Sequence, residues 1–172
     1  IEKWRAALPF LERIDSLFKE LVPDAHRKQH ERALMTPDFQ ISNTAFSTVT
    51  INYSWRTASH KDAGDFKEGF GNLIVCEDAQ NPYTYTGCYT GFPKYKVAIN
   101  IRNGDFAAMN VHEWHCNTEF IPTFDTKLLE TENNKNKLNN IKNDWHYNRL
   151  SVVCYLREKM IRCRDMDMNS YK

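Results

Sequence analysis

The N-terminal part of the chain repeats its apolar side chains with the period of an α-helix. From Pro9 to Val22 the apolar residues recur at spacings of three and four, and charged residues fill the other positions. This spacing predicts an amphipathic helix with Pro9 in its first turn. Pro23 is expected to end that helix, and Asp24 is placed to cap a second, more polar helix over Ala25–Met35.

After Pro37 the pattern changes from helical spacing to short runs rich in Val, Ile, Thr and aromatic residues, which predict β-strands. Glycines punctuate these runs, as is typical of turns. Helices followed by several short strands indicate one α+β domain over residues 1–172, with helical support over 1–36 and a barrel or sandwich body over 44–157. The predicted strands are residues 45–53, 72–76, 95–101, 105–109 and 150–155.

One segment, at about 130–148, interrupts the strand pattern. It consists largely of Asn and Lys and offers almost nothing apolar to bury, so we expect a solvated loop or disordered insertion between two strands. Two alternatives are equally favoured for its lysines: they contact a phosphate backbone, or they are simply solvated. Trp145 within it is a candidate wedge or lid.

The overall composition narrows the class of protein. With 172 residues and 41% hydrophobic residues, the chain can bury its own core. The net charge of +1 argues against a protein that coats nucleic acid through bulk electrostatics. The longest apolar runs have the length of a strand, which predicts no membrane span. Five cysteines without C-x-x-C spacing indicate a reducing compartment rather than a disulfide framework.

Candidate chemistry begins at His60-Lys61-Asp62, which follows a strand-like run. Alternate residues of an extended chain point the same way, so His60 and Asp62 can present an imidazole and a carboxylate to one point. A second imidazole comes from the segment that holds His112 and His115. Two histidines and one carboxylate form the ligand set of non-haem Fe(II), although a solvated His–Asp pair is the alternative for an isolated H-x-D.

A second pair of polar residues opens the last predicted strand. Arg149 and Ser151 alternate onto one face, where a guanidinium fork and a hydroxyl are suited to bind a carboxylate. The order H-x-D, distal His, R-x-S is the layout of 2-oxoglutarate/Fe(II) dioxygenases with a double-stranded β-helix.

Five motifs carry a closer resemblance, which extends over residues 44–156, about two thirds of the chain. The sequence resembles the TET/JBP-like oxygenases, which hydroxylate the methyl group of 5-methylpyrimidines in DNA. The motifs are SHKDAGDF (59–66), GFGNLIV (69–75), TGCYTGFP (86–93), NGDFAAMNVHEWHCNT (103–118) and NRLSVVCY (148–155).

The resemblance implies a double-stranded β-helix core of the jelly-roll or cupin type, with Fe(II), the co-substrate 2-oxoglutarate and O2. It implies His60, Asp62 and His115 as metal ligands, because a small-residue turn is expected directly after the distal ligand, at Cys116–Thr118. His112 then lies beside the ligands rather than on the metal, as a candidate substrate contact. Two departures are Cys88, where the family often has glycine, and the long insertion before Arg149.

The same resemblance assigns the co-substrate and substrate contacts. Arg149 and Ser151 are implied to hold the distal carboxylate of 2-oxoglutarate, and Arg56 is a candidate for its other end. Asp65 falls where the family places a side chain that reads the flipped base. An ionised Asp65 favours the amine of 5-methylcytosine over O4 of thymine, and it still accepts from thymine N3–H. Arg157 is a candidate contact to the base or its phosphate.

These features predict an oxygenase that acts as a monomer on DNA containing a 5-methylpyrimidine, inside the nucleus or cytoplasm or encoded by a virus. Two alternatives stay open. One is the same chemistry on a free nucleotide, a small molecule or a protein side chain, and the other is a non-catalytic β-barrel binding module. For Trp114, beside the expected ligand, core packing is favoured over stacking on a base.

Overall fold

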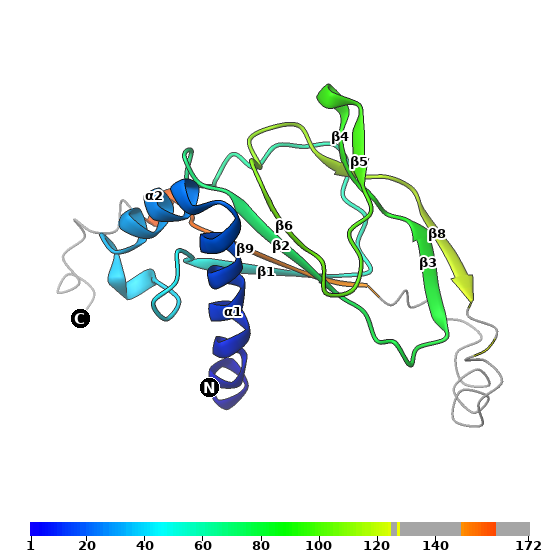
Figure 1. Cartoon of the computed structure of the whole chain (residues 1–172), viewed down its shortest axis with the longest axis horizontal. Coiled ribbons are helices and arrows are strands. Elements are labelled where there is room, and N and C mark those ends of the chain that lie inside the picture. The colour runs from blue at the N-terminus through cyan, green and yellow to red at the C-terminus, as the bar shows by residue number, and fades with distance from the viewer. Residues whose placement is uncertain (125–126, 128–148, 161–172) are drawn as a thin grey trace, which may run out of the picture.

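The computed structural model describes residues 1–124, 127 and 149–160, and the predicted insertion at 130–148, with Trp145, lies outside them. The chain folds into two N-terminal helices and three antiparallel sheets. Figure 1 shows the helices at one end and the ribbon of β3 (Tyr83–Gly87) and β8 (Phe120–Phe124) at the other. No helix in the described ranges combines the length and the apolar content that a membrane span requires.

Both helices exist, but their starts differ from the prediction. Helix α1 spans Glu2–Leu21 and contains Pro9 in its interior, because the preceding residues EKWRAAL are strong helix formers that extend it upstream. Helix α2 spans Pro23–Ala33. Pro23 occupies its first turn and Val22 is its N-cap residue, so the expected capping role of Asp24 is wrong. A short 3-10 turn, η1, follows at Pro37–Phe39.

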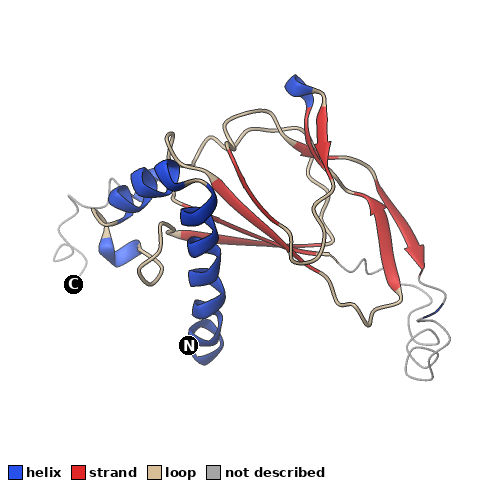
Figure 2. Ribbon diagram, viewed as in Figure 1, coloured by secondary structure: helices blue, strands red, loops and turns tan. Residues whose placement is uncertain are grey.

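The main sheet has four antiparallel strands in the order β1-β9-β2-β6 (Figure 2). Four predicted strands are thereby confirmed, although β1 begins three residues later than expected. Val, Ile and Thr fill these strands because branched side chains pack well on a pleated surface. Their bounds are β1 (Thr48–Tyr53), β2 (Gly71–Cys76), β6 (Phe106–Met109) and β9 (Leu150–Tyr155).

The remaining strands form two smaller sheets, β3-β8 and β5-β4-β7. The predicted strand 95–101 is only partly correct, because Tyr95 closes the 3-10 turn η2 (Pro93–Tyr95) and Lys96 adopts a left-handed backbone with φ of 55°. The α+β class is confirmed, and the antiparallel sheets are consistent with a jelly-roll, but they are not closed into a barrel. The strands of the second small sheet are β4 (Thr90–Phe92), β5 (Val97–Ile99) and β7 (Cys116–Asn117).

The two faces of the main sheet have different surroundings. On one face, Val152 and Cys154 pack with Ile14 and Phe18 of α1 in the larger hydrophobic core. The intervening residues of the same strand, Ser151 among them, point to the other face by strand alternation and line a cavity. The sheet therefore separates the structural core on the α1 side from the cavity on the other.

Candidate active site

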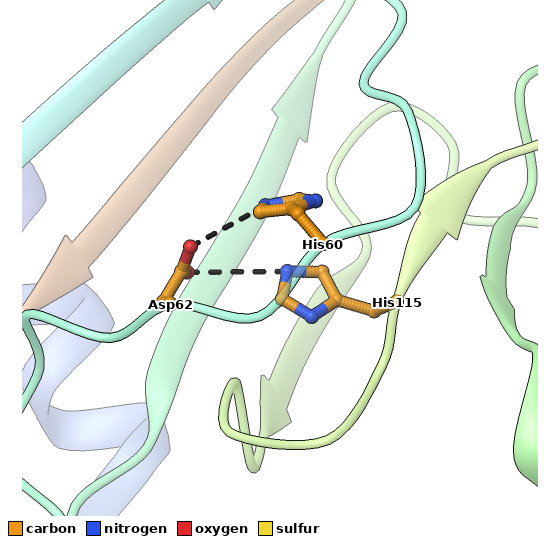
Figure 3. Close-up of side chains that lie close together, drawn as sticks. All are labelled: His60, Asp62 and His115. Carbon is orange, nitrogen blue, oxygen red and sulfur yellow. Dashed lines mark ion pairs between the residues drawn. The ribbon is translucent and has the colours of Figure 1, made fainter.

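Two backbone segments that are distant in sequence meet at the mouth of this cavity. His60 and His115 form an isolated antiparallel bridge, in which each backbone N–H donates to the other carbonyl at 3.0 Å. The backbone N–H of Asp62 donates to the carbonyl of Val111 at 3.0 Å. These three backbone bonds fix the positions from which the two imidazoles and the carboxylate converge, as Figure 3 shows.

The orientation of each imidazole is set by its own local backbone. Nδ1 of His60 donates to the carbonyl of Ala58 at 2.8 Å, and Nδ1 of His115 donates to the carbonyl of Glu113 at 2.9 Å. A carbonyl only accepts, so both Nδ1 atoms carry the proton. Each neutral ring is left with a lone pair on Nε2, which is the arrangement that metal-binding histidines use.

The exposed lone pairs face a carboxylate. Nε2 of His60 lies 3.3 Å from Oδ1 of Asp62, and Nε2 of His115 lies 3.9 Å from Oδ2. One ligand atom from each of the three residues lies within 4.8 Å of the others. Two neutral imidazoles and a carboxylate that face one another are stabilised by a cation between them, so this donor set fits a divalent metal. A two-histidine, one-carboxylate set suits Fe(II) and leaves further coordination positions open.

The cavity beside this cluster has a volume of about 410 Å³. Arg149 and Ser151 line it together, as strand alternation predicts, and their exposed fractions are 3% and 4%. No described carboxylate lies within ion-pair distance of the Arg149 guanidinium, and its Nε has no hydrogen-bond partner in this part of the chain. A buried cation without a counter-ion is costly, so this end of the cavity fits an anionic ligand.

Asp65 lines the opposite part of the cavity and pairs through its backbone with Arg157 in an isolated antiparallel bridge. Burial and the nearby negative charge of Asp62 raise the pKa of the Asp65 carboxyl to about 7, although His112 and Arg157 act in the opposite direction. Arg157 also lines the cavity, with its side chain exposed. Two of the three predicted substrate contacts, Asp65 and Arg157, therefore lie in the same cavity as the metal cluster.

Two other predicted site residues lie outside the lining of the cavity. Nε2 of His112 lies 3.2 Å from the carbonyl of Phe66, which places this ring behind the loop that carries Asp65. Arg56 is exposed. Burial raises the pKa of the Cys88 thiol, and the positive charge of Arg56 acts in the opposite direction. The small-residue turn expected after His115 is wrong, because Cys116–Asn117 forms strand β7.

Thr90 is a lining residue of the cavity to which the sequence assigned no role. It begins β4 and is 4% exposed, and its hydroxyl has no hydrogen-bond partner in the described ranges. The motif TGCYTGFP contained it, but nothing in that motif separates a cavity-lining threonine from a turn residue. Within the same motif, Cys88 has φ of 52°, the left-handed region that glycine prefers, at the position where the family often has glycine.

Trp114 differs from the expectation of core packing. Its side chain is 48% exposed, and Nζ of Lys61 lies 5.6 Å from the ring centroid. Trp55 lines the cavity and is 63% exposed. Trp55 and Trp114 both lie next to short irregular segments. In such segments no periodic pattern distinguishes a buried ring from an exposed one.

The fold and the donor set define the class as a metal site of the two-histidine, one-carboxylate type beside an anion-binding cavity. Residues 4–158 match the Tet_JBP family, the oxygenase domain of the 2OGFeDO superfamily, and the chain belongs to this family. Membership of that superfamily implies Fe(II) and 2-oxoglutarate, which the donor set and the buried guanidinium fit.

Several curated proteins are similar to this chain. "Bifunctional helicase and thymine dioxygenase JBP2" of Leishmania infantum is 32% identical over 149 residues, which cover 87% of this chain and 11% of the relative. "Thymine dioxygenase JBP1-B" of Trypanosoma cruzi is 30% identical over 158 residues, or 91% of this chain and 16% of the relative. The chain thus spans between a tenth and a sixth of the length of these relatives.

Proposed function

We propose that this chain is an Fe(II)- and 2-oxoglutarate-dependent dioxygenase that hydroxylates the methyl group of a 5-methylpyrimidine in DNA, with thymine as the favoured base. The observation that carries the proposal is the convergence of His60, Asp62 and His115 beside a cavity that contains a buried arginine, which no described carboxylate pairs with. The relatives named as thymine dioxygenases support the choice of base. Because DNA is the proposed substrate, we propose the nucleus or the cytoplasm as its location, with a virus-encoded enzyme included.

In this proposal His60, Asp62 and His115 hold the metal, and the two Nδ1–carbonyl bonds keep their rings aimed at it. Bound Fe(II) supplies the oxidative chemistry that couples decarboxylation of 2-oxoglutarate to hydroxylation of the methyl group. Arg149 and Ser151 bind the distal carboxylate, which supplies the missing counter-charge and fixes the orientation of the co-substrate. Apolar lining residues such as Leu73, Met109 and Val153 exclude water.

The substrate end of the cavity has to bind a base extruded from the duplex. A carboxyl whose pKa lies near 7 is available in its protonated form near neutral pH. Protonated Asp65 donates to O4 of thymine and accepts from N3–H, whereas ionised Asp65 matches the amine of 5-methylcytosine. The raised pKa therefore supports thymine, and it changes the preference that an ionised Asp65 implied.

The experiment compares the chain with His60→Ala, and with His30→Ala as a matched control in which the same side chain is removed from α2. Wild type and His30→Ala are expected to convert 2-oxoglutarate to succinate with Fe(II), and to gain thermal stability with Mn(II). His60→Ala is expected to lose both. Equal succinate formation by all three proteins would refute the metal assignment.

A second assay addresses the substrate. Duplex DNA containing thymine and 5-methylcytosine is incubated with enzyme, Fe(II) and 2-oxoglutarate, and the nucleosides are analysed by mass spectrometry. We expect a gain of one oxygen on thymine. Turnover of 2-oxoglutarate with both bases unchanged would reject DNA and favour a free nucleotide, a small molecule or a protein side chain. Absence of any turnover with the metal cluster intact would favour a non-catalytic binding module.

A further inference from the structure

Two aromatic side chains, one beside a candidate metal ligand and one at the tip of a hairpin, are exposed in the described part of the protein. Trp114 directly precedes His115 and is 48% exposed. Tyr95 closes η2, at the tip of the β4–β5 hairpin, and is 55% exposed. Figure 1 shows this hairpin projecting from the body of the molecule.

A lysine ammonium accompanies each of these rings. Nζ of Lys61 lies 5.6 Å from the centroid of Trp114, and Nζ of Lys94 lies 5.1 Å from that of Tyr95. Lys94 also donates to both carboxylate oxygens of Glu113, at 3.0 and 3.1 Å. The Lys94–Glu113 pair thus ties the tip of the hairpin to the loop that carries Trp114.

These contacts join five residues, here called the rim patch: Lys61, Lys94, Tyr95, Glu113 and Trp114. Lys61 stands between two of the candidate ligands and itself lines the cavity. The hairpin is fixed to the same place, because Gly91 of β4 pairs with Cys116, the residue after His115.

The chemistry of the rim patch selects one kind of polymer. Two lysines against one glutamate leave a local positive charge in a chain whose total is +1, and both rings present a flat apolar face. Lysine ammonium groups bind phosphates, and aromatic faces stack on unstacked bases. Extrusion of one nucleotide from a duplex exposes the faces of its neighbours at the point where they would meet the rim.

We propose that the rim patch binds the DNA strand beside the extruded nucleotide, with Trp114 and Tyr95 stacking on the exposed bases and Lys61 and Lys94 contacting phosphates. This inference rests on the proposed function. It assigns a DNA-binding role to residues outside the metal cluster and outside the co-substrate end of the cavity. The surface requires no base-specific hydrogen bond, so it contributes affinity and position rather than sequence preference.

The test measures binding of a fluorescein-labelled duplex containing thymine by fluorescence anisotropy, for wild type, Trp114→Ala and Tyr95→Ala. Trp4→Ala is the matched control, because Trp4 is 49% exposed on α1, which packs on the far face of the main sheet. Loss of one stacked base is expected to weaken binding about tenfold, while Trp4→Ala leaves it unchanged. Lys94→Gln is expected to lower the slope of log affinity against log salt by about one.

A separate readout distinguishes loss of stacking from damage to the metal site. Mn(II)-induced thermal stabilisation and DNA-independent turnover of 2-oxoglutarate are expected to stay at the wild-type level in Tyr95→Ala, and Trp114→Phe is expected to restore most of the binding. Wild-type affinity in both alanine variants overturns the rim patch and leaves the proposed function intact. Failure of the wild-type chain to bind or oxidise DNA overturns both.

Discussion

The protonation of Asp65 makes the stability of the metal-free protein depend on pH. The folded state holds the pKa of this carboxyl at about 7, chiefly because it is buried, whereas an unfolded chain holds it near 3.8. As the pH rises from about 4 to 7, the unfolded state releases this proton and the folded state keeps it. Stability is therefore lost with rising pH through this range, and the loss is complete above the folded pKa.

The magnitude follows from the two pKa values. Each pKa unit corresponds to about 1.4 kcal/mol, so the difference between 3.8 and about 7 gives a total of about 4 kcal/mol as an upper limit. Between pH 5 and pH 8 the expected share is about 3 kcal/mol. Asp65→Asn removes the titration but keeps the shape, so it should abolish this part of the pH dependence.

The assay is urea unfolding of the metal-free protein at pH 5 and pH 8 in the presence of a chelator. Asp24→Asn, at an exposed position of α2, serves as the matched control. We expect the free energy of unfolding of Asp65→Asn, relative to wild type, to rise by about 3 kcal/mol from pH 5 to pH 8. The same pH dependence in wild type and in Asp65→Asn would show that burial does not hold this carboxyl neutral, and would remove its support for thymine.

Three further predictions test the co-substrate end, the backbone and the core. Arg149→Met is expected to leave the metal-free protein equally or more stable but to weaken 2-oxoglutarate binding roughly 100-fold, measured by calorimetry, because it removes a buried cation for which the described residues provide no counter-ion. Gly87→Ala should lower stability by at least about 2 kcal/mol in urea, since φ is 76° and a Cβ would overlap the carbonyl oxygen of Glu119. Gly104→Ala, at φ of 81° in open space, should cost only about 1 kcal/mol. Phe18→Ala should lower the free energy of unfolding by about 3–5 kcal/mol, because the ring is fully buried in the core. A smaller loss of stability would mean that neighbouring core side chains move into the space that the ring leaves.

Much of the main sheet and both helices could be predicted from local pattern. The strand that carries Ser151 was predicted because the run 150–155 has the composition of a strand, and alternation along it places Arg149 and Ser151 on one face. Local reasoning failed at the helix starts, because Pro9 does not stop a helix that strong formers begin upstream. It also missed β3, β4, β7 and β8, and it located β5 only in part.

Some features of the candidate site could likewise be predicted from the sequence, and others could not. The sequence alone determined which residue types are available, that His60 and Asp62 point the same way, and that an arginine and a serine share a strand face, because these follow from spacing within a single segment. Only the tertiary structure decided that His115 pairs with His60 and that Arg149 is buried without a described counter-ion. It alone showed that Trp114 is exposed. The physical reason is that burial and proximity depend on pairings between segments distant in the chain, and spacing within one segment carries no information about them.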